Sequence, residues 1–253
     1  MSTDPARALS EWLRGRLAAA GARGFVVGLS GGIDSAVVAR LCQFAAPQKT
    51  LGVVLPCYSH PQDEEDARLV ALEFHLPTLK VDLGATFDAL TSTLAGAIRG
   101  LPTHVDVPDI KQQMPEANIK PRLRMTSLYF LANSLNYLVA GTGNRCELAL
   151  GYFTKYGDGG VDVLPIGHLL KSEVRALAKE LGVPQRIVDK PPTAGLWMGQ
   201  TDEVEMGFSY DTLEQYLVKG ASAVPAEVAR RIEQLQRSSQ HKRTRAPVPD
   251  SAG

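Results

Sequence analysis

The sequence has few cysteines, no excess of either charge and no long apolar run. Its three cysteines lie far apart and form no Cys-x-x-Cys pair, which argues against a disulfide framework and against a zinc or dithiol redox site. Basic and acidic residues both number 27, so the formal net charge is zero. Because binding to bulk nucleic acid or to an anionic membrane usually requires a basic excess, we expect neither partner.

No segment has the pattern of a targeting signal or of a membrane span. Residues Met1 to Arg16 are polar with helical spacing, and no apolar stretch reaches the length that crosses a bilayer. We therefore expect a cytoplasmic protein. The hydrophobic content of 44% is enough to bury a substantial core.

Strand-like and helix-like runs alternate after an N-terminal amphipathic helix, which falls within residues 1–20. The expected strands are 25–29, 51–55, 78–82 and 137–140, and the expected helices are 35–44, 62–74, 86–98 and 121–136. Such alternation predicts an α/β fold with a doubly wound parallel sheet flanked by helices. We expect one domain over residues 1–253, with ligands at the carboxyl ends of the strands.

Two segments with little periodicity, 99–118 and 189–201, are predicted to be long mobile loops. The polar, basic stretch at 239–253 has the composition of a frayed tail, in which a histidine is ordinarily just solvated. These three segments connect or follow the regular elements rather than belong to them.

The most informative segment is Gly28-Leu-Ser-Gly-Gly-Ile-Asp-Ser-Ala36, between an apolar strand and a helical pattern. A strand, a glycine turn and a helix aim backbone N–H groups and a helix N-terminus at one small volume, which is a geometry that holds phosphate. Asp34 would repel that phosphate unless a cation lay between them, so we predict Mg²⁺ at this position. The alternative is an ordinary Gly–Ser turn.

Thr142, Asn144 and Glu147 follow the fourth expected strand. Since two carboxylates near a triphosphate require a metal, Glu147 is predicted to give Mg²⁺ a second oxygen opposite Asp34. The alternative is a surface helix start, with Asn144 as the N-cap and Glu147 in the third position of a capping-box variant.

Cations at helix starts suggest an anionic ligand. Residues 118–125 place Lys120, Arg122 and Arg124 in the first turns of an expected helix, where the helix dipole disfavours positive charge unless an anion binds. Lys171 begins another helix with the same conflict unless it is paired. A solvated basic face on a stable helix is the alternative for the first group.

The segment 151–160 combines four glycines with three aromatic residues, which suits stacking on flat rings. Lys155 can neutralise a phosphate or a carboxylate. Asp158 and Asp162 can accept hydrogen bonds from a ribose or from an incoming amine. A glycine-rich hairpin turn with core aromatic residues is the alternative.

Taken in order, these segments resemble the ammonia-dependent NAD synthetases, which are N-type ATP pyrophosphatases with the adenine nucleotide alpha hydrolase-like fold. The resemblance runs from Gly28 to Arg243 and is carried by S-G-G-I-D-S-A, G-Y-F-T-K-Y-G-D-G-G, K-P-P-T-A-G-L and a late H-K-R. The first motif is not a Walker A loop and is shared with other adenylylating enzymes. The second and third motifs separate the NAD synthetases from them.

The resemblance implies a ligase that amidates nicotinic acid adenine dinucleotide (deamido-NAD) to NAD with ammonia and ATP, through an adenylylated carboxylate. It also implies a homodimer whose interface holds the dinucleotide, with the 239–253 tail in the substrate site and Mg²⁺ on Asp34 and Glu147. The implied ATP contacts are Gly28, Leu29, Ser30, Gly31, Gly32, Ile33, Asp34, Ser35, Thr142, Lys171 and Thr193. The implied dinucleotide contacts are Arg122, Lys155, Asp162, His241 and Lys242.

For the chemistry, we expect Lys171 and the glycine-rich loop to hold the leaving pyrophosphate, and Asp158 or Asp162 to take a proton from ammonium. We expect the 190–201 loop to exclude water from the intermediate. One rival is a tRNA-modifying ATP pyrophosphatase, which the neutral charge and scattered cysteines disfavour. The other is a nucleotide-binding module of the universal-stress type, in which the cations at Arg122, Lys155 and Lys242 would lack a purpose.

Overall fold

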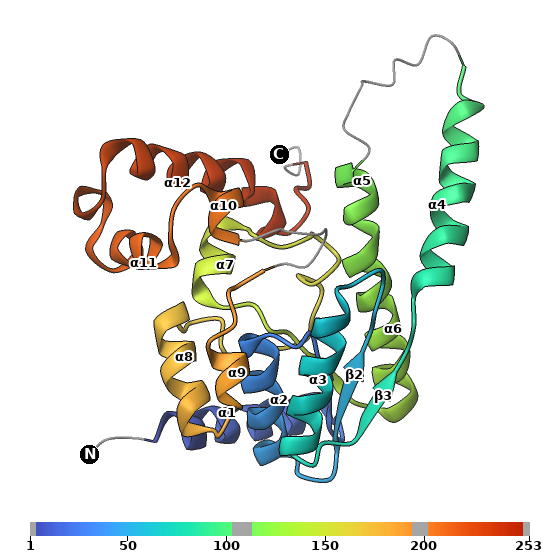
Figure 1. The fold of residues 1–253 in the computed structure, drawn as a ribbon, viewed down its shortest axis with the longest axis vertical. Helices are drawn as coiled ribbons and strands as arrows, with labels where there is room; N and C mark the ends of the chain where they lie inside the picture. Colours follow the sequence, from blue (N-terminus) through green and yellow to red (C-terminus); the bar gives the residue numbers. More distant parts are fainter. Residues whose placement is uncertain (1–3, 103–112, 194–201, 250–253) are drawn as a thin grey trace.

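The computed structural model describes residues 4–102, 113–193 and 202–249 and is built on a parallel sheet (Figure 1). The sheet has four strands in the order β3-β2-β1-β4, all parallel to their neighbours. The strands are β1 (Phe25–Gly28), β2 (Thr50–Val54), β3 (Thr78–Lys80) and β4 (Leu138–Ala140). Each overlaps the strand expected from the sequence, and the α/β fold class is confirmed.

Helices surround this sheet and extend the molecule beyond it. The helices that precede β4 in the chain are α1 (Pro5–Ala20), α2 (Ile33–Ala45), α3 (Pro61–Glu73), α4 (Gly84–Arg99), α5 (Gln113–Ala117) and α6 (Ile119–Leu135). The later ones are α7 (Arg145–Leu150), α8 (Lys171–Glu180), α9 (Gln185–Val188), α10 (Asp202–Met206), α11 (Tyr210–Lys219) and α12 (Ala226–Ser238), with 3₁₀ turns η1 (Ala221–Ala223) and η2 (Gln240–Lys242).

Both faces of the sheet are covered at β1, β2 and β4, whereas the edge strand β3 is exposed. Successive side chains of a strand point to opposite faces. Phe25 and Val27 of β1 pack in a core cluster with residues of α1, α2, α3 and α8. Val26 packs on the other face with Val53 and Val139, against residues of α4 and α6.

The topology places a ligand crevice beside β1. The chain passes from β1 through β2 to β3 at one edge, then returns to place β4 on the opposite side of β1. Ligands of open α/β sheets bind where the strand order reverses, at the carboxyl ends of the strands. The segments after Gly28 and after Ala140 therefore face one another across this point.

A third apolar cluster lies outside the sheet layers and joins α7 to the C-terminal helices. Cys146 and Leu150 of α7 pack there with Phe208, with Leu213 of α11 and with Ile232 of α12. Helices α9 to α12 were not predicted from the sequence. Helices α9 and α10 have only four and five residues, while α11 and α12 pack against α7, from which they are distant in sequence.

The two predicted loops are only partly within the described residues. Arg99 ends α4, and the short helix α5 occupies Gln113–Ala117, so the end of the expected 99–118 loop is helical. Residues 103–112 and 194–201 lie outside the described residues, so the predicted mobility of these two segments stays a prediction. In the three described ranges, none of the helices combines the length and apolarity needed to cross a bilayer.

Candidate active site

The glycine-rich loop joins β1 to α2 and is held in shape by its own serines. The Ser35 hydroxyl donates to the Gly32 carbonyl oxygen at 2.9 Å and accepts from the Ser30 N–H at 3.2 Å. The Gly32 N–H donates to Ser30 Oγ at 3.2 Å, and Gly32 caps α2 without a side-chain bond. The start of α2 therefore presents backbone donors that a phosphate could accept.

Gly31 is required at the tip of this loop. Its φ is +76°, a left-handed conformation that residues with a Cβ rarely adopt. A Cβ there would lie 2.4 Å from the Asp63 carbonyl oxygen and 2.9 Å from Asp66 Cβ. The loop therefore packs directly on α3 at this point.

Lys171 and Asp34 form a buried ion pair beside the loop. Lys171 is the first residue of α8, is 2% exposed, and contacts an Asp34 carboxylate oxygen through its ammonium. The same ammonium lies 5.3 Å from the centre of the Tyr210 ring. Burial disfavours its charge, but the carboxylates of Asp34 and Glu147 outweigh this and raise the pKa of Lys171.

Asn144 connects the two predicted metal ligands. Its side-chain oxygen accepts the Glu147 N–H at 3.1 Å while its own N–H donates to Glu147 Oε2 at 3.0 Å, so the capping box is formed. Its side-chain amide also donates to Asp34 Oδ1 at 3.2 Å. The capping box is confirmed, but the expected surface position is wrong, because Asn144 is fully buried. The contact of Asn144 with Asp34 brings this helix start to the side of the crevice that holds Asp34.

The pair of carboxylates fits a magnesium site that is completed by phosphate. Desolvation and the nearby Asp34 raise the pKa of Glu147, so a second positive charge here would be favourable. Mg²⁺ is commonly held by one or two carboxylates together with substrate phosphates and waters. Within the described ranges, no group of three or more His, Cys, Asp or Glu side chains is arranged to hold a metal without such help.

The second glycine-rich segment packs against the C-terminal residues. Lys155 Nζ donates to the His241 carbonyl oxygen at 2.7 Å. Lys242 Nζ donates to the carbonyl oxygens of Gly151 at 2.8 Å and Phe153 at 2.7 Å. Arg122 lies 3.4 Å from the Lys155 carbonyl oxygen. Four of the five predicted dinucleotide contacts are thus brought together by segments far apart in the chain.

Asp158 and Asp162 occupy different surroundings. Asp158 accepts the Thr154 N–H at 2.9 Å and closes a turn within the glycine-rich segment. Asp162 accepts from the Tyr129 hydroxyl at 3.0 Å and from the Val139 N–H at 2.8 Å, so it ties α6 to β4. Asp158 is exposed at the surface. Desolvation of its carboxyl raises its pKa, and the hydrogen bond from the Thr154 N–H acts in the opposite direction by lowering it.

The two threonines predicted to contact ATP differ in their exposure to solvent. Thr142 is partly buried in the loop after β4, close in sequence to Asn144. Thr193 is exposed and is the last described residue before position 202. Their expected contacts to ATP stay predictions.

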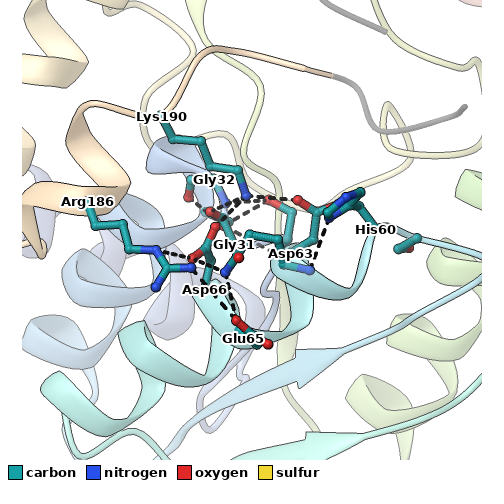
Figure 2. Close-up of polar contacts among 12 residues, drawn as sticks. Gly31, Gly32, His60, Asp63, Glu65, Asp66, Arg186 and Lys190 are labelled. Carbon is teal, nitrogen blue, oxygen red and sulfur yellow. Dashed lines mark hydrogen bonds and ion pairs between the residues drawn. The ribbon is translucent and has the colours of Figure 1, made fainter. Parts of the chain in front are cut away.

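The sequence analysis missed two groups that the fold brings to this site. One is Tyr210, whose hydroxyl donates to Asp202 at 2.9 Å and whose ring faces Lys171. The other is Lys190, which lies in the K-P-P-T motif and contacts Gly31 (Figure 2). The motif pointed to Lys190, but no spacing in the sequence could connect it with a loop so far away.

The comparisons with known proteins agree with this geometry. A model of the family described as NAD synthase matches residues 6–246. The NH3-dependent NAD+ synthetase of Carboxydothermus hydrogenoformans is 52% identical over 241 residues, covering 95% of each chain. A structure described as NMN synthetase from Francisella tularensis matches with a TM-score of 0.88 at 36% identity and covers 98% of each chain. An NH3-dependent NAD synthetase structure from Campylobacter jejuni matches with a TM-score of 0.76 at 26% identity over 97% of each chain. The chain belongs to the NAD synthase family.

Proposed function

We propose that this protein is a ligase that amidates deamido-NAD to NAD, with ammonia as the nitrogen donor and ATP as co-substrate. The observation that carries the proposal is the meeting of Asp34, Glu147 and Lys171 at the switch point of the sheet, next to the glycine-rich loop. Family membership and 52% identity to an NH3-dependent NAD+ synthetase support the same reaction.

In the first step, an oxygen of the nicotinate carboxylate attacks the α-phosphorus of ATP. The bond from that phosphorus to the bridging oxygen breaks, and pyrophosphate leaves with the electron pair. We propose that residues 28–35, Thr142, Lys171 and Thr193 contact ATP. Backbone donors of the loop and the buried ammonium of Lys171 then stabilise the charge that develops on pyrophosphate. Asp34 and Glu147 would hold Mg²⁺, which supplies charge neutralisation between carboxylates and phosphates.

In the second step, the nitrogen of ammonia attacks the acyl carbon of the mixed anhydride, and AMP leaves with the electron pair of the broken C–O bond. The nitrogen must lose a proton, and we propose Asp158 as its acceptor. The pKa of its carboxyl is raised by desolvation, which is the direction that favours a general base. Arg122, Lys155, Asp162, His241 and Lys242 are proposed to contact the dinucleotide.

Two further features are proposed for the whole protein. The first is a homodimer that covers the apolar outer side of α4 and α6, where Leu94, Ile98 and Phe130 are exposed. The second is a cytoplasmic location, which suits the three free buried thiols because that compartment is reducing.

A second candidate substrate is nicotinic acid mononucleotide. The solved structure with the TM-score of 0.88 is described as an NMN synthetase, and amidation of the mononucleotide acid gives NMN. The same crevice chemistry serves both acids, because only the part of the substrate remote from the carboxylate differs.

A pyrophosphate-release assay tests the proposal. The purified protein is incubated with ATP, Mg²⁺ and ammonium, together with deamido-NAD, nicotinic acid mononucleotide or no acid. We expect pyrophosphate and NAD in equal amounts with deamido-NAD, and little release without an acid. A higher kcat/KM for the mononucleotide would favour the second candidate, and release that is independent of any acid would contradict both.

A further inference from the structure

Lys190 lies at the centre of a charged cluster between the glycine-rich loop and α3 (Figure 2). Its ammonium contacts Asp63 Oδ1 at 2.8 Å and Asp66 Oδ2 at 2.6 Å. It also lies 3.4 Å from the carbonyl oxygen of Gly31. The cluster therefore joins three segments that are distant in sequence: the loop after β1, the start of α3 and the segment after α9.

The contact with Gly31 bears on the direction of one peptide group. In a planar trans peptide the C=O and the N–H point in opposite directions. Since the Gly31 carbonyl faces Lys190, the N–H of Gly32 faces away from it, on the side where it donates to Ser30 Oγ at 3.2 Å. That side is where the loop offers its backbone donors.

A Gly–Gly peptide has unusual freedom to rotate, because neither residue has a Cβ to restrict it. The reversed orientation would turn an N–H toward the ammonium of Lys190 and remove a donor from the phosphate side. At 3.4 Å the contact is long for a hydrogen bond, so the attraction is chiefly between a full charge and the carbonyl dipole. A fixed cation here therefore favours one of the two orientations.

The cation is itself held firmly. Asp66 is 2% exposed and accepts from Lys190 on one oxygen and from Arg186 Nε on the other, at 3.0 Å. Burial opposes the charge of Lys190, but hydrogen bonds to Asp63 and Asp66 outweigh it and raise the pKa of Lys190. Lys190 thus stays protonated at neutral pH, with little freedom to leave Gly31.

We propose that Lys190 is a positioning residue for ATP. It holds the Gly31–Gly32 peptide with its N–H turned away from α3, toward the side of Ser30 Oγ where the pyrophosphate is proposed to bind, and Asp63 and Asp66 hold Lys190 in place. It acts through the loop and makes no contact with the nucleotide. The proposal rests on the function proposed above, since it assigns pyrophosphate to this loop.

The test compares Lys190→Met with Arg186→Met. Both variants remove a cation from Asp66, but only Lys190 contacts Gly31, so Arg186→Met is a matched control for the loss of charge. For each we would measure the thermal midpoint, the affinity for Mg–ATP by calorimetry, and the KM values for ATP and deamido-NAD. We expect Lys190→Met to weaken ATP about tenfold, the size of one lost charge-assisted contact, and to leave the KM for deamido-NAD nearly unchanged.

Arg186→Met should lower the thermal midpoint without changing ATP affinity, and Lys190→Arg should restore part of the ATP affinity. Equal loss of ATP affinity in Arg186→Met and Lys190→Met, or none in Lys190→Met, would overturn the proposal. If Lys190→Met does not fold, Asp63→Asn replaces it as the test variant. We then expect a smaller loss of ATP affinity, again with a nearly unchanged KM for deamido-NAD. The calorimetry measures ATP binding and needs no acid substrate. A wild-type protein that binds ATP but forms no NAD would therefore contradict the proposed function, and the role of Lys190 could still be tested.

Discussion

At the scale of single residues, the candidate site brings two carboxylates and one buried ammonium close together. Asp34 and Glu147 face the same crevice, and burial together with the charge of Asp34 raises the pKa of Glu147. In the ligand-free protein the ammonium of Lys171 compensates, because it is buried against Asp34. Substitutions here therefore affect stability and activity in opposite directions.

The variant Glu147→Gln tests this balance. Because the pKa of Glu147 is raised, the folded protein favours its neutral form, and a neutral glutamine keeps the capping box with Asn144. We expect a higher thermal midpoint without Mg²⁺ and a loss of Mg²⁺-dependent NAD formation of at least about a hundredfold. Glu173→Gln is the control: Glu173 accepts the Leu170 N–H at 2.7 Å in the same helical position, and its loss should not raise the midpoint. An unchanged rate in Glu147→Gln would contradict the assignment.

Gly31→Ala tests the packing of the loop on α3. The added methyl group would lie 2.4 Å from the Asp63 carbonyl oxygen at a φ of +76°, so the loop must move. We expect a loss of roughly 2 kcal/mol in the free energy of unfolding, together with weaker ATP binding. Gly15→Ala, in the middle of α1 with no atom within 4 Å, should instead stabilise the protein. Chemical denaturation of both variants provides the comparison.

At the scale of elements, the sequence predicted what periodicity and strand order determine. The four strands and the helices α1 to α4 and α6 were predicted from regular apolar spacing, and α1 lies within its expected range of 1–20, whereas α5 falls in a segment that was predicted to be a loop. Asp34 and Glu147 could be paired in advance because both follow strands whose carboxyl ends meet. The contacts of Lys190 with α3 could not, since they depend on how α9 packs against the sheet layer rather than on any local pattern.

The C-terminal segment is an element whose role can be isolated. Ser239 Oγ donates to the Leu150 carbonyl oxygen at 2.7 Å, and Lys242 reaches Gly151 and Phe153, so the tail begins docked on the second glycine-rich segment. The composition of the tail predicted fraying, and this part of it is instead ordered. Burial lowers the pKa of Lys242, which is consistent with its packed position.

Lys242→Met should affect the dinucleotide and leave ATP alone. We expect the KM for deamido-NAD to rise about tenfold, since two hydrogen bonds that hold the segment are lost, with a KM for ATP close to that of the wild type. Arg237→Met is the control. Among the ion pairs of the described residues, Arg237 forms one only with Glu233, on the exposed side of α12. Steady-state kinetics with each substrate varied in turn would decide, and equal changes in both KM values would count against a local role.

At the scale of the whole molecule, helices α4 and α6 expose large apolar side chains to solvent. Helix α4 has no buried residue and stands at the edge of the body, where part of it contacts α6 (Figure 1). Leu90, Leu94 and Ile98 of α4 are exposed, and Phe130 of α6 is 71% exposed. Apolar patches of this kind mark association surfaces, which supports the proposed homodimer.

Phe130→Asp should break that dimer. A charge buried in an apolar interface is unfavourable, so we expect a monomer at micromolar concentration and a fall in activity. Leu72→Asp introduces the same charge at an exposed position of α3 and should remain dimeric. Sedimentation velocity distinguishes the two, and a dimer that persists in Phe130→Asp would move the interface elsewhere.

The ion pair between Lys171 and Asp34 has a consequence for a cell short of magnesium. Since a side chain of the protein already supplies a positive charge where the metal is proposed to bind, the unliganded crevice need not come apart through repulsion. Chelation of Mg²⁺ should therefore abolish NAD formation while the circular dichroism spectrum stays that of the folded protein. Adding Mg²⁺ back should restore the full rate without a refolding step. Scarcity of magnesium would leave a dormant pool of enzyme rather than a damaged one.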